Sequence, residues 1–159
     1  MILVLDASTL INLANGEVLD TVLNIPDVEY HVSTVVRQES RTVARAIDDA
    51  VAARRLSLVD DTLISIVSFA EIKERYNLDD GETECLLAAQ AMDCWVACDD
   101  AAGRAAVGAV LGGARLKGSI GLLKMAITAG LITSGEAFTA YTLMRNRGGY
   151  LPVLQATDF

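Results

Sequence analysis

The chain opens with the stretch ILVLDAS, residues 2–8, in which four apolar residues run directly into an aspartate. A continuous apolar run of this length is typical of a strand that is buried on both faces of a parallel sheet. We therefore predict a strand over Ile2–Leu5, with Asp6 at its carboxyl end, and a short helix over Ser8–Ala14 that ends near Gly16.

Short apolar segments alternate with helical patterns along the rest of the chain. Further strands are expected at Tyr30–Ser33, Leu56–Val59, Trp95–Cys98 and Ala114–Leu116. Helices are expected at Val18–Asn24, from Val35 onward, and over Thr42–Arg54, Thr62–Tyr76, Glu82–Met92, Ala101–Leu111, Ile120–Ala129 and Gly135–Arg147. This alternation predicts one α/β domain over residues 1–159, a three-layer α/β/α sandwich around a parallel sheet of four to five strands.

Composition narrows the class of protein. With 159 residues, 52% of them hydrophobic, and only two prolines, the chain is expected to fold around a substantial core. Its apolar runs are shorter than the roughly 20 residues that cross a bilayer, so no membrane segment is expected. The three cysteines, Cys85, Cys94 and Cys98, are an odd number in a chain without an apparent export signal, which favours a reducing cytoplasm over disulfides.

The formal net charge of −8 argues against broad, non-specific attraction to nucleic acid. Either the protein does not bind nucleic acid, or part of its negative charge is clustered to hold cations. The positions of several acids favour the second interpretation, because open parallel sheets bind ligands at the carboxyl ends of their strands. These acids are Asp6 after the first strand, Glu39 one turn into the helix after the second, Glu82 and Glu84 at the start of the helix before the fourth, and Asp99 and Asp100 after the fourth.

Such a cluster predicts a divalent-metal site. Neighbouring carboxylates repel each other and raise each other's pKa, and a cation removes that cost. Mg²⁺ or Mn²⁺ prefers oxygen ligands and keeps waters that can be activated, so the site needs neither histidine nor cysteine. Each acid also has a structural interpretation: Asp6 or Asp99 as a helix cap, Glu82 and Glu84 as partners of a helix dipole, and Glu39 as surface charge.

Several segments resemble the motifs of PIN domains. They are VLDASTLINL at residues 4–13, VVRQE at 35–39, LDDGETECLLAA at 78–89 with the Gly-Glu-x-Glu helix opening of a PIN subgroup, and VACDDAAGR at 96–104. The stretch GSIGLL at 118–123 resembles the segment that leads into the C-terminal helices of these domains. The resemblance covers about residues 1–132 in the right order.

The resemblance implies a metal-dependent ribonuclease with a flavodoxin-like α/β/α sandwich, of the kind that often serves as a VapC-type toxin. It implies RNA as substrate, Mg²⁺ or Mn²⁺ as cofactor, and a small antitoxin as partner; we also expect a homodimer. The implied catalytic and metal-binding acids are Asp6, Glu39, Glu82 and Asp99, with Glu84 and Asp100 as further metal ligands and Ser8 as an accessory residue. Glutamate at position 82 departs from the aspartate of commoner PIN toxins, and its longer side chain changes the expected metal geometry.

Basic residues near these motifs are weaker candidates. Arg104 could meet a phosphate, and Lys117 and Lys124 could contact substrate, but ordinary surface positions explain them more simply.

Three other functions fit part of the pattern. A phosphatase of the haloacid dehalogenase type, a Mg-dependent hydrolase, would want a second aspartate where Ser8 stands. A receiver domain would use Asp60 and Lys117, but it needs paired acids where Asp6 stands alone. A non-catalytic PIN-like binding or regulatory protein with a weakened metal site is the third alternative. Metal binding that raises the melting temperature would separate the nuclease from it.

Overall fold

The computed structural model describes all residues 1–159 and contains one sheet of five strands. The strands are β1 (Ile2–Leu5), β2 (Glu29–Val32), β3 (Ser57–Leu58), β4 (Trp95–Ala97) and β5 (Leu116–Lys117). They lie in the order β3-β2-β1-β4-β5, and every neighbouring pair is parallel. The predicted parallel sheet is therefore confirmed. Its strand order differs from the 2-1-3-4-5 order of flavodoxin-like proteins. The chain therefore shares the three-layer arrangement of these proteins but not their strand order.

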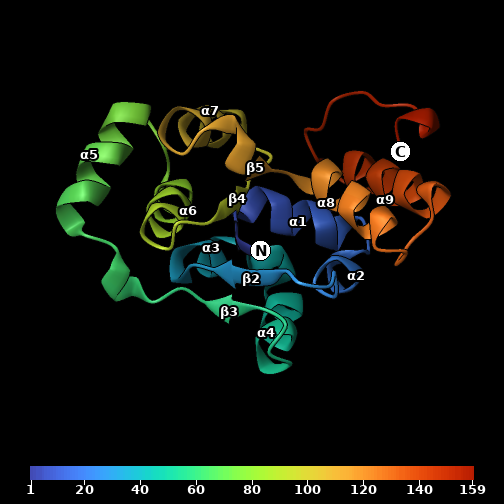
Figure 1. Cartoon of the computed structure of the whole chain (residues 1–159), viewed down its shortest axis with the longest axis horizontal. Helices are drawn as coiled ribbons and strands as arrows, with labels where there is room; N and C mark the ends of the chain where they lie inside the picture. Colours follow the sequence, from blue (N-terminus) through green and yellow to red (C-terminus); the bar gives the residue numbers. More distant parts are fainter.

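Two groups of helices flank the sheet. The helices are α1 (Ala7–Asn15), α2 (Leu19–Val22), α3 (Thr34–Glu39), α4 (Ala44–Ala52), α5 (Ile66–Tyr76), α6 (Asp80–Ala91), α7 (Ala101–Val110), α8 (Ser119–Thr128) and α9 (Ser134–Asn146). Short 3₁₀ turns occupy Arg41–Val43, Asp61–Leu63, Gly113–Arg115 and Ala156–Asp158. Helices α1, α8 and α9 pack together near the C-terminus, while α6 packs against α3, α5 and α7 (Figure 1). None of the helices has the length and apolar character needed to cross a bilayer.

The core forms around the central strand. Leu3, Val4 and Leu5 of β1 are fully buried, as expected for a strand with helices on both sides. Leu86 on α6 and Leu122 on α8 are also fully buried and belong to the same cluster. Burying each such side chain stabilises the fold by roughly 1.5–3 kcal/mol, which explains why the strand that opens the chain lies at the centre of the sheet.

Some predicted elements have different boundaries. The helix expected over Thr62–Tyr76 is divided, because Ser65 is extended and its side chain caps α5. The strand expected at Ala114–Leu116 begins only at Leu116, since the two preceding residues form a 3₁₀ turn. Asp79 caps α6 and starts that helix at Asp80 rather than at the expected Glu82.

Strand order places the candidate site. From β1 the chain crosses to β2 and β3 on one side, and β4 and β5 lie on the other side of β1. The strand order therefore reverses between β1 and β4, the place where open α/β sheets form ligand crevices. Helices α1, α3, α7 and α8 all begin just after the carboxyl end of a strand, so their first residues gather at this edge.

Candidate active site

Asp6 stands at the carboxyl end of β1, beside β4. Its backbone N–H donates to the carbonyl of Ala97 at 2.9 Å, and its side chain caps α1 by accepting from the Ser8 N–H at 3.1 Å. Only 3% of Asp6 is exposed. Burial raises the pKa of this carboxyl above its usual value, although hydrogen bonds from Ser8 and Cys98 partly offset the effect.

Ser8 joins the ends of the two central strands. Its hydroxyl donates to Asp6 Oδ2 at 2.5 Å and accepts from the backbone N–H groups of Asp99 and Asp100, at 3.0 and 3.3 Å. One donor and both acceptor lone pairs of the hydroxyl are thus used. Ser8, predicted as an accessory residue, holds the Asp99-Asp100 turn against Asp6.

Asp99 is held by α1 and α8. Its Oδ2 accepts from Asn12 Nδ2 at 2.8 Å and from the Ser119 hydroxyl, and its Oδ1 accepts from the Ser119 N–H at 2.9 Å. Asn12 lies four residues after Ser8, so both project from one face of α1 toward the end of β4. Three of the roughly four acceptor sites of the Asp99 carboxylate are therefore occupied within the chain.

Glu82 and Asp100 form a pair of carboxyls between α6 and α7. Glu82 Oε1 accepts from the Gly103 N–H at 3.1 Å, and Asp100 Oδ1 accepts from the same N–H at 3.4 Å. Glu82 Oε2 also closes a capping box with Asp79. Burial, followed by the hydrogen bond with Asp100, raises the pKa of Glu82 to about 7. Burial alone would raise the pKa of Asp100. Hydrogen bonds with the Glu82 carboxyl and with the N–H groups at the start of α7 outweigh burial and lower this pKa.

Glu39 and Glu84, the remaining two predicted acids, have different surroundings. Burial and the charges of Asp79 and Asp6 raise the pKa of Glu39, so this exposed side chain at the end of α3 belongs electrostatically to the cluster. Glu84 instead accepts from the Val35 N–H at 3.3 Å, at the start of α3. Glu39 is therefore coupled to Asp79 and Asp6, and Glu82 to Asp100, whereas Asp99 and Glu84 are held by other partners.

Three glycines make room for these carboxylates. A Cβ on Gly81 would lie 2.2 Å from Glu39 Oε2, and one on Gly103 would lie 2.7 Å from Cys98 Sγ and 3.0 Å from Glu82 Oε1. A Cβ on Gly118 would lie 2.5 Å from Asp99 Oδ1. Side chains at these positions would push the acids away, so close approach rather than backbone flexibility requires glycine here.

Sequence reasoning missed Asn12, Ser119, Asp79 and the role of these glycines. For Asn12 a signal existed, because a polar residue four positions after Ser8 on an otherwise apolar helix shares its face. For Asp79 a signal also existed, because an acidic or hydroxyl residue three positions before a glutamate is the signature of a capping box. For Ser119 no local signal existed, since its contact with Asp99 joins segments that only the fold brings together.

Arg104 is neither a free phosphate ligand nor an ordinary surface residue. Its guanidinium donates to the carbonyls of Cys98 and Lys117, at 2.8 and 3.0 Å, and so ties the ends of β4 and β5 together.

The acidic cluster lacks a compensating cation within the chain. None of the six ion pairs of the structure includes Asp6, Glu39, Glu82, Asp99 or Asp100. The atoms that these side chains could offer to a metal are all carboxylate oxygens, the ligands that Mg²⁺ and Mn²⁺ prefer. No three of the acidic, histidine or cysteine side chains are grouped in a position to hold a metal ion. These carboxylates suit a divalent ion in chemistry and charge but are not grouped around one metal position, so the metal ligands inferred from the sequence stay a prediction.

Comparison with known proteins points to one family. A protein-family model for the PIN domain matches residues 2–155, nearly the whole chain. No curated protein and no solved structure matches the chain.

Proposed function

This chain belongs to the PIN domain family, whose members are generally nucleases, and we propose that it is a metal-dependent ribonuclease. One observation carries the proposal: carboxyls of raised pKa gather at the switch point of the sheet without any basic side chain to neutralise them. A structural network would normally pair such acids with Lys or Arg, because uncompensated like charges are costly. Divalent cations are the partners that would remove this cost.

The proposed ligands are Asp6 and Asp99, with Glu39 completing the shell, while Glu82, which the sequence also implied as a ligand, is assigned to proton transfer instead. Asp6 is the strongest candidate because it is buried and only Oδ2 receives side-chain donors. Asp99 keeps one acceptor site free beside its bonds to Asn12 and Ser119. When bound, a divalent ion would supply positive charge that orients the scissile phosphate and lowers the pKa of a water.

Glu82 is the proposed proton carrier. Hydrolysis of a phosphodiester requires a group that takes a proton from the attacking water or gives one to the leaving oxygen. A carboxyl with a pKa of about 7 is matched to this task, whereas an ordinary glutamate is almost fully ionised at neutral pH. The neighbouring Asp100 stabilises the protonated form of Glu82 by hydrogen bonding with it.

Helix N-termini provide attraction for phosphate in a chain of net charge −8. Asp6 and Asp100 are the N-caps of α1 and α7, and Gly118 is the N-cap of α8. The positive ends of these three helices therefore lie beside the acids and favour an anion there.

The structure disfavours both phosphatase and receiver functions. The Ser8 hydroxyl is fully engaged with Asp6, Asp99 and Asp100, so it does not replace a second acid. Lys117 lies with Nζ 4.8 Å from the centre of the Trp95 ring, a cation–π contact rather than a bond to an acid. The strand order is also not that of a receiver domain.

We further propose the toxin role, with an antitoxin and a second copy of the chain as partners. Support for a dimer comes from Ile66 and Val67 on α5, which are 87% and 67% exposed at the end of the molecule far from the C-terminus (Figure 1). Neighbouring exposed apolar side chains of this size are typical of a protein interface. An antitoxin that presents a basic side chain would suit the uncompensated acids.

Cleavage of transfer, ribosomal and messenger RNA, with Mn²⁺, with Mg²⁺ and with a chelator, tests the function. The expected result is cleavage that requires the metal and is lost in Asp6→Asn. Cleavage that persists unchanged in purified Asp6→Asn would rule out the proposed site.

A non-catalytic binding protein is the second candidate function. The observation in its favour is that no three potential ligands are grouped around a metal position. Absence of divalent binding, together with retained RNA binding, would favour this candidate over the nuclease.

A further inference from the structure

A surface groove lies beside the acidic cluster and has Asp99 in its lining. It encloses about 1050 Å³ and lies between β5, the start of α8 and the segment that follows α9. In Figure 1 that segment leaves α9 beside α8 and returns along α9 to the C-terminus. The groove therefore shares Asp99 with the candidate active site.

The lining of the groove is basic. Arg104, Lys117 and Arg145 line it, and Asp99 is its only acidic residue. In a chain with 13 basic and 21 acidic residues, this local excess of positive charge is opposite to the overall balance. The basic lining of the groove would attract a polyanion. One of its phosphates would then lie at the acids, with a cation between the phosphate and the carboxylates.

Tyr150 stands at the rim with its side chain almost fully in solvent. It lines the groove and is 97% exposed, the highest value among the large hydrophobic side chains. The backbone on both sides of it is anchored. Gly149 packs so closely on Asn12 that a Cβ would lie 2.5 Å from its Oδ1, and Leu151 is buried.

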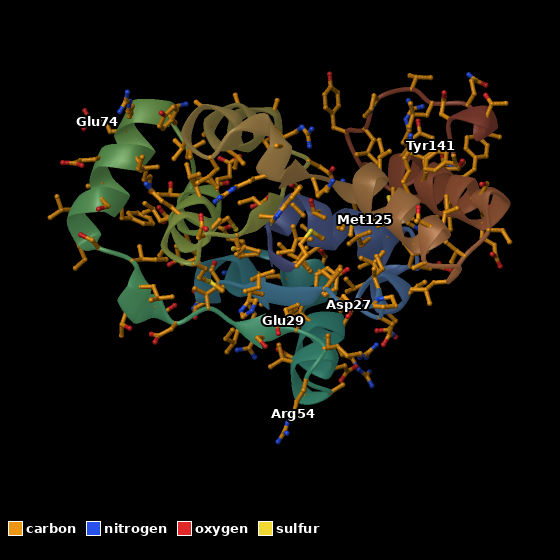
Figure 2. All side chains as sticks on the ribbon, viewed as in Figure 1. Asp27, Glu29, Arg54, Glu74, Met125 and Tyr141 are labelled. Atoms are coloured by element: carbon orange, nitrogen blue, oxygen red, sulfur yellow. The ribbon has the colours of Figure 1, made fainter.

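Tyr141 fixes the segment beyond Tyr150. Its hydroxyl donates to the Pro152 carbonyl at 2.6 Å and accepts from the Leu154 N–H at 2.9 Å. Figure 2 shows Tyr141 on α9 beneath this segment. The backbone that carries the Tyr150 ring is thus fixed on both sides. The exposed ring therefore forms a flat platform that loses little conformational entropy on binding.

We propose that this groove binds single-stranded RNA, with a base stacked on Tyr150 and phosphates beside Lys117 and Arg145. The inference rests on the proposed nuclease function, because it supplies the path by which a strand reaches the acids. Aromatic stacking combined with a positive groove is the general mode by which proteins hold single strands.

Charge favours RNA over a protein as the occupant. A protein partner that neutralises the acids would itself present basic residues, and Arg104, Lys117 and Arg145 would repel them. The groove also includes Asp99 in its lining, so a strand bound there would pass next to this acid.

The test measures binding of a labelled, unstructured eight-nucleotide RNA by fluorescence anisotropy, with a chelator present to prevent cleavage. Tyr150→Ala should weaken binding roughly 5- to 150-fold, the range for loss of one base–aromatic stack. Tyr150→Phe keeps the ring and should bind like the native protein. Arg145→Ala should lower the slope of log affinity against log salt by about 0.7, as for one lost phosphate contact on a single strand.

Arg45→Ala is the matched control, because Arg45 is exposed on α4, at another edge of the molecule from this segment (Figure 1). Its salt slope and affinity should equal those of the native protein. Equal affinity of Tyr150→Ala and native protein would overturn the stacking platform. An Arg145→Ala slope equal to that of Arg45→Ala would overturn the phosphate path and leave the groove to a protein partner.

Cleavage separates this inference from the proposed function. Metal-dependent RNA cleavage that is unaffected by Tyr150→Ala would refute the groove and keep the nuclease. Tyr150-dependent RNA binding without cleavage in any divalent metal would refute the nuclease and keep the groove.

Discussion

Glu82 and Asp100 accept hydrogen bonds from one shared donor, the backbone N–H of Gly103, at 3.1 and 3.4 Å. Glu82 lies in the first turn of α6, which precedes β4 in the chain, and Asp100 caps α7, which follows β4. Two carboxylates this close favour a state with one proton between them. Glu82 takes this proton, since its pKa is raised to about 7 while that of Asp100 is lowered.

Stability of the metal-free protein should therefore fall as pH rises from about 4.5 to about 7. Within this window the folded state binds more protons than the unfolded state, because the pKa of Glu82 in the folded protein lies above the usual glutamate value of 4.5. Asp6 and Glu39 shift in the same direction and add to the slope. Melting temperatures measured across this range in a chelator check the prediction.

Glu82→Gln provides the matched variant. Glutamine can still complete the capping box with Asp79, but it does not titrate. The decline of the melting temperature should become shallower in this variant. An identical decline in both proteins would show that Glu82 does not carry the proton.

Asp6→Asn and Asp99→Asn should both abolish cleavage but differ in stability. Asparagine caps a helix as well as aspartate does, and at position 6 it removes a buried charge, so the melting temperature should be kept or raised. At position 99 the NH₂ group of asparagine would face donors from Asn12 and Ser119, which should lower the free energy of unfolding by about 1–3 kcal/mol. Differential scanning calorimetry compares the two variants. Equal destabilisation would show that Asp6 is mainly a structural cap.

Mn²⁺ or Mg²⁺ should raise the melting temperature of the native protein. A ligand at ten times its Kd adds about 1.4 kcal/mol, or several degrees for a domain of this size. Asp6→Asn should lose most of this rise, and Asp49→Asn, on the exposed side of α4, should keep it. Titration calorimetry that detects no divalent binding at millimolar concentrations would contradict the metal site.

Gly81→Ala should reduce cleavage while changing stability by less than about 1 kcal/mol. Its Cβ would meet Glu39 Oε2, the end of an exposed side chain that can move away, while alanine suits the helix better than glycine. Gly108→Ala on α7 is the control, since nothing lies within 4 Å of its Cβ. It should stabilise the protein by about 0.5–1 kcal/mol and leave cleavage unchanged. Full cleavage by Gly81→Ala would remove Glu39 from the site.

The protein should form a dimer through α5 at tens of micromolar. Ile66→Ser combined with Val67→Ser should shift light scattering toward the monomer mass without lowering the melting temperature of the monomer, because both side chains are exposed. A native protein that is already monomeric at this concentration would refute the interface.

The amino-acid sequence by itself determined the fold class and the positions of Asp6, Asp99 and Asp100. An apolar run that is buried on both faces forms a strand through local hydrophobic patterning, and the residue after it necessarily lies at the strand's carboxyl end. The family motifs added Glu39, whose pKa the charges of Asp79 and Asp6 help to raise, and Glu82, whose pKa Asp100 and Asp79 help to raise. These inferences needed only the order of residues along the chain.

Only the tertiary structure decided where the side chains point. The Ser8 hydroxyl accepts from the Asp99 N–H, a residue 91 positions away, and Glu84 turns toward Val35, 49 positions away. The groove at Tyr150 likewise exists because the segment after α9 packs beside β5 and α8. Such contacts depend on which helices the sheet brings together, and local patterning carries no information about distant partners. The sequence therefore located the acids, and packing determined which of them meet.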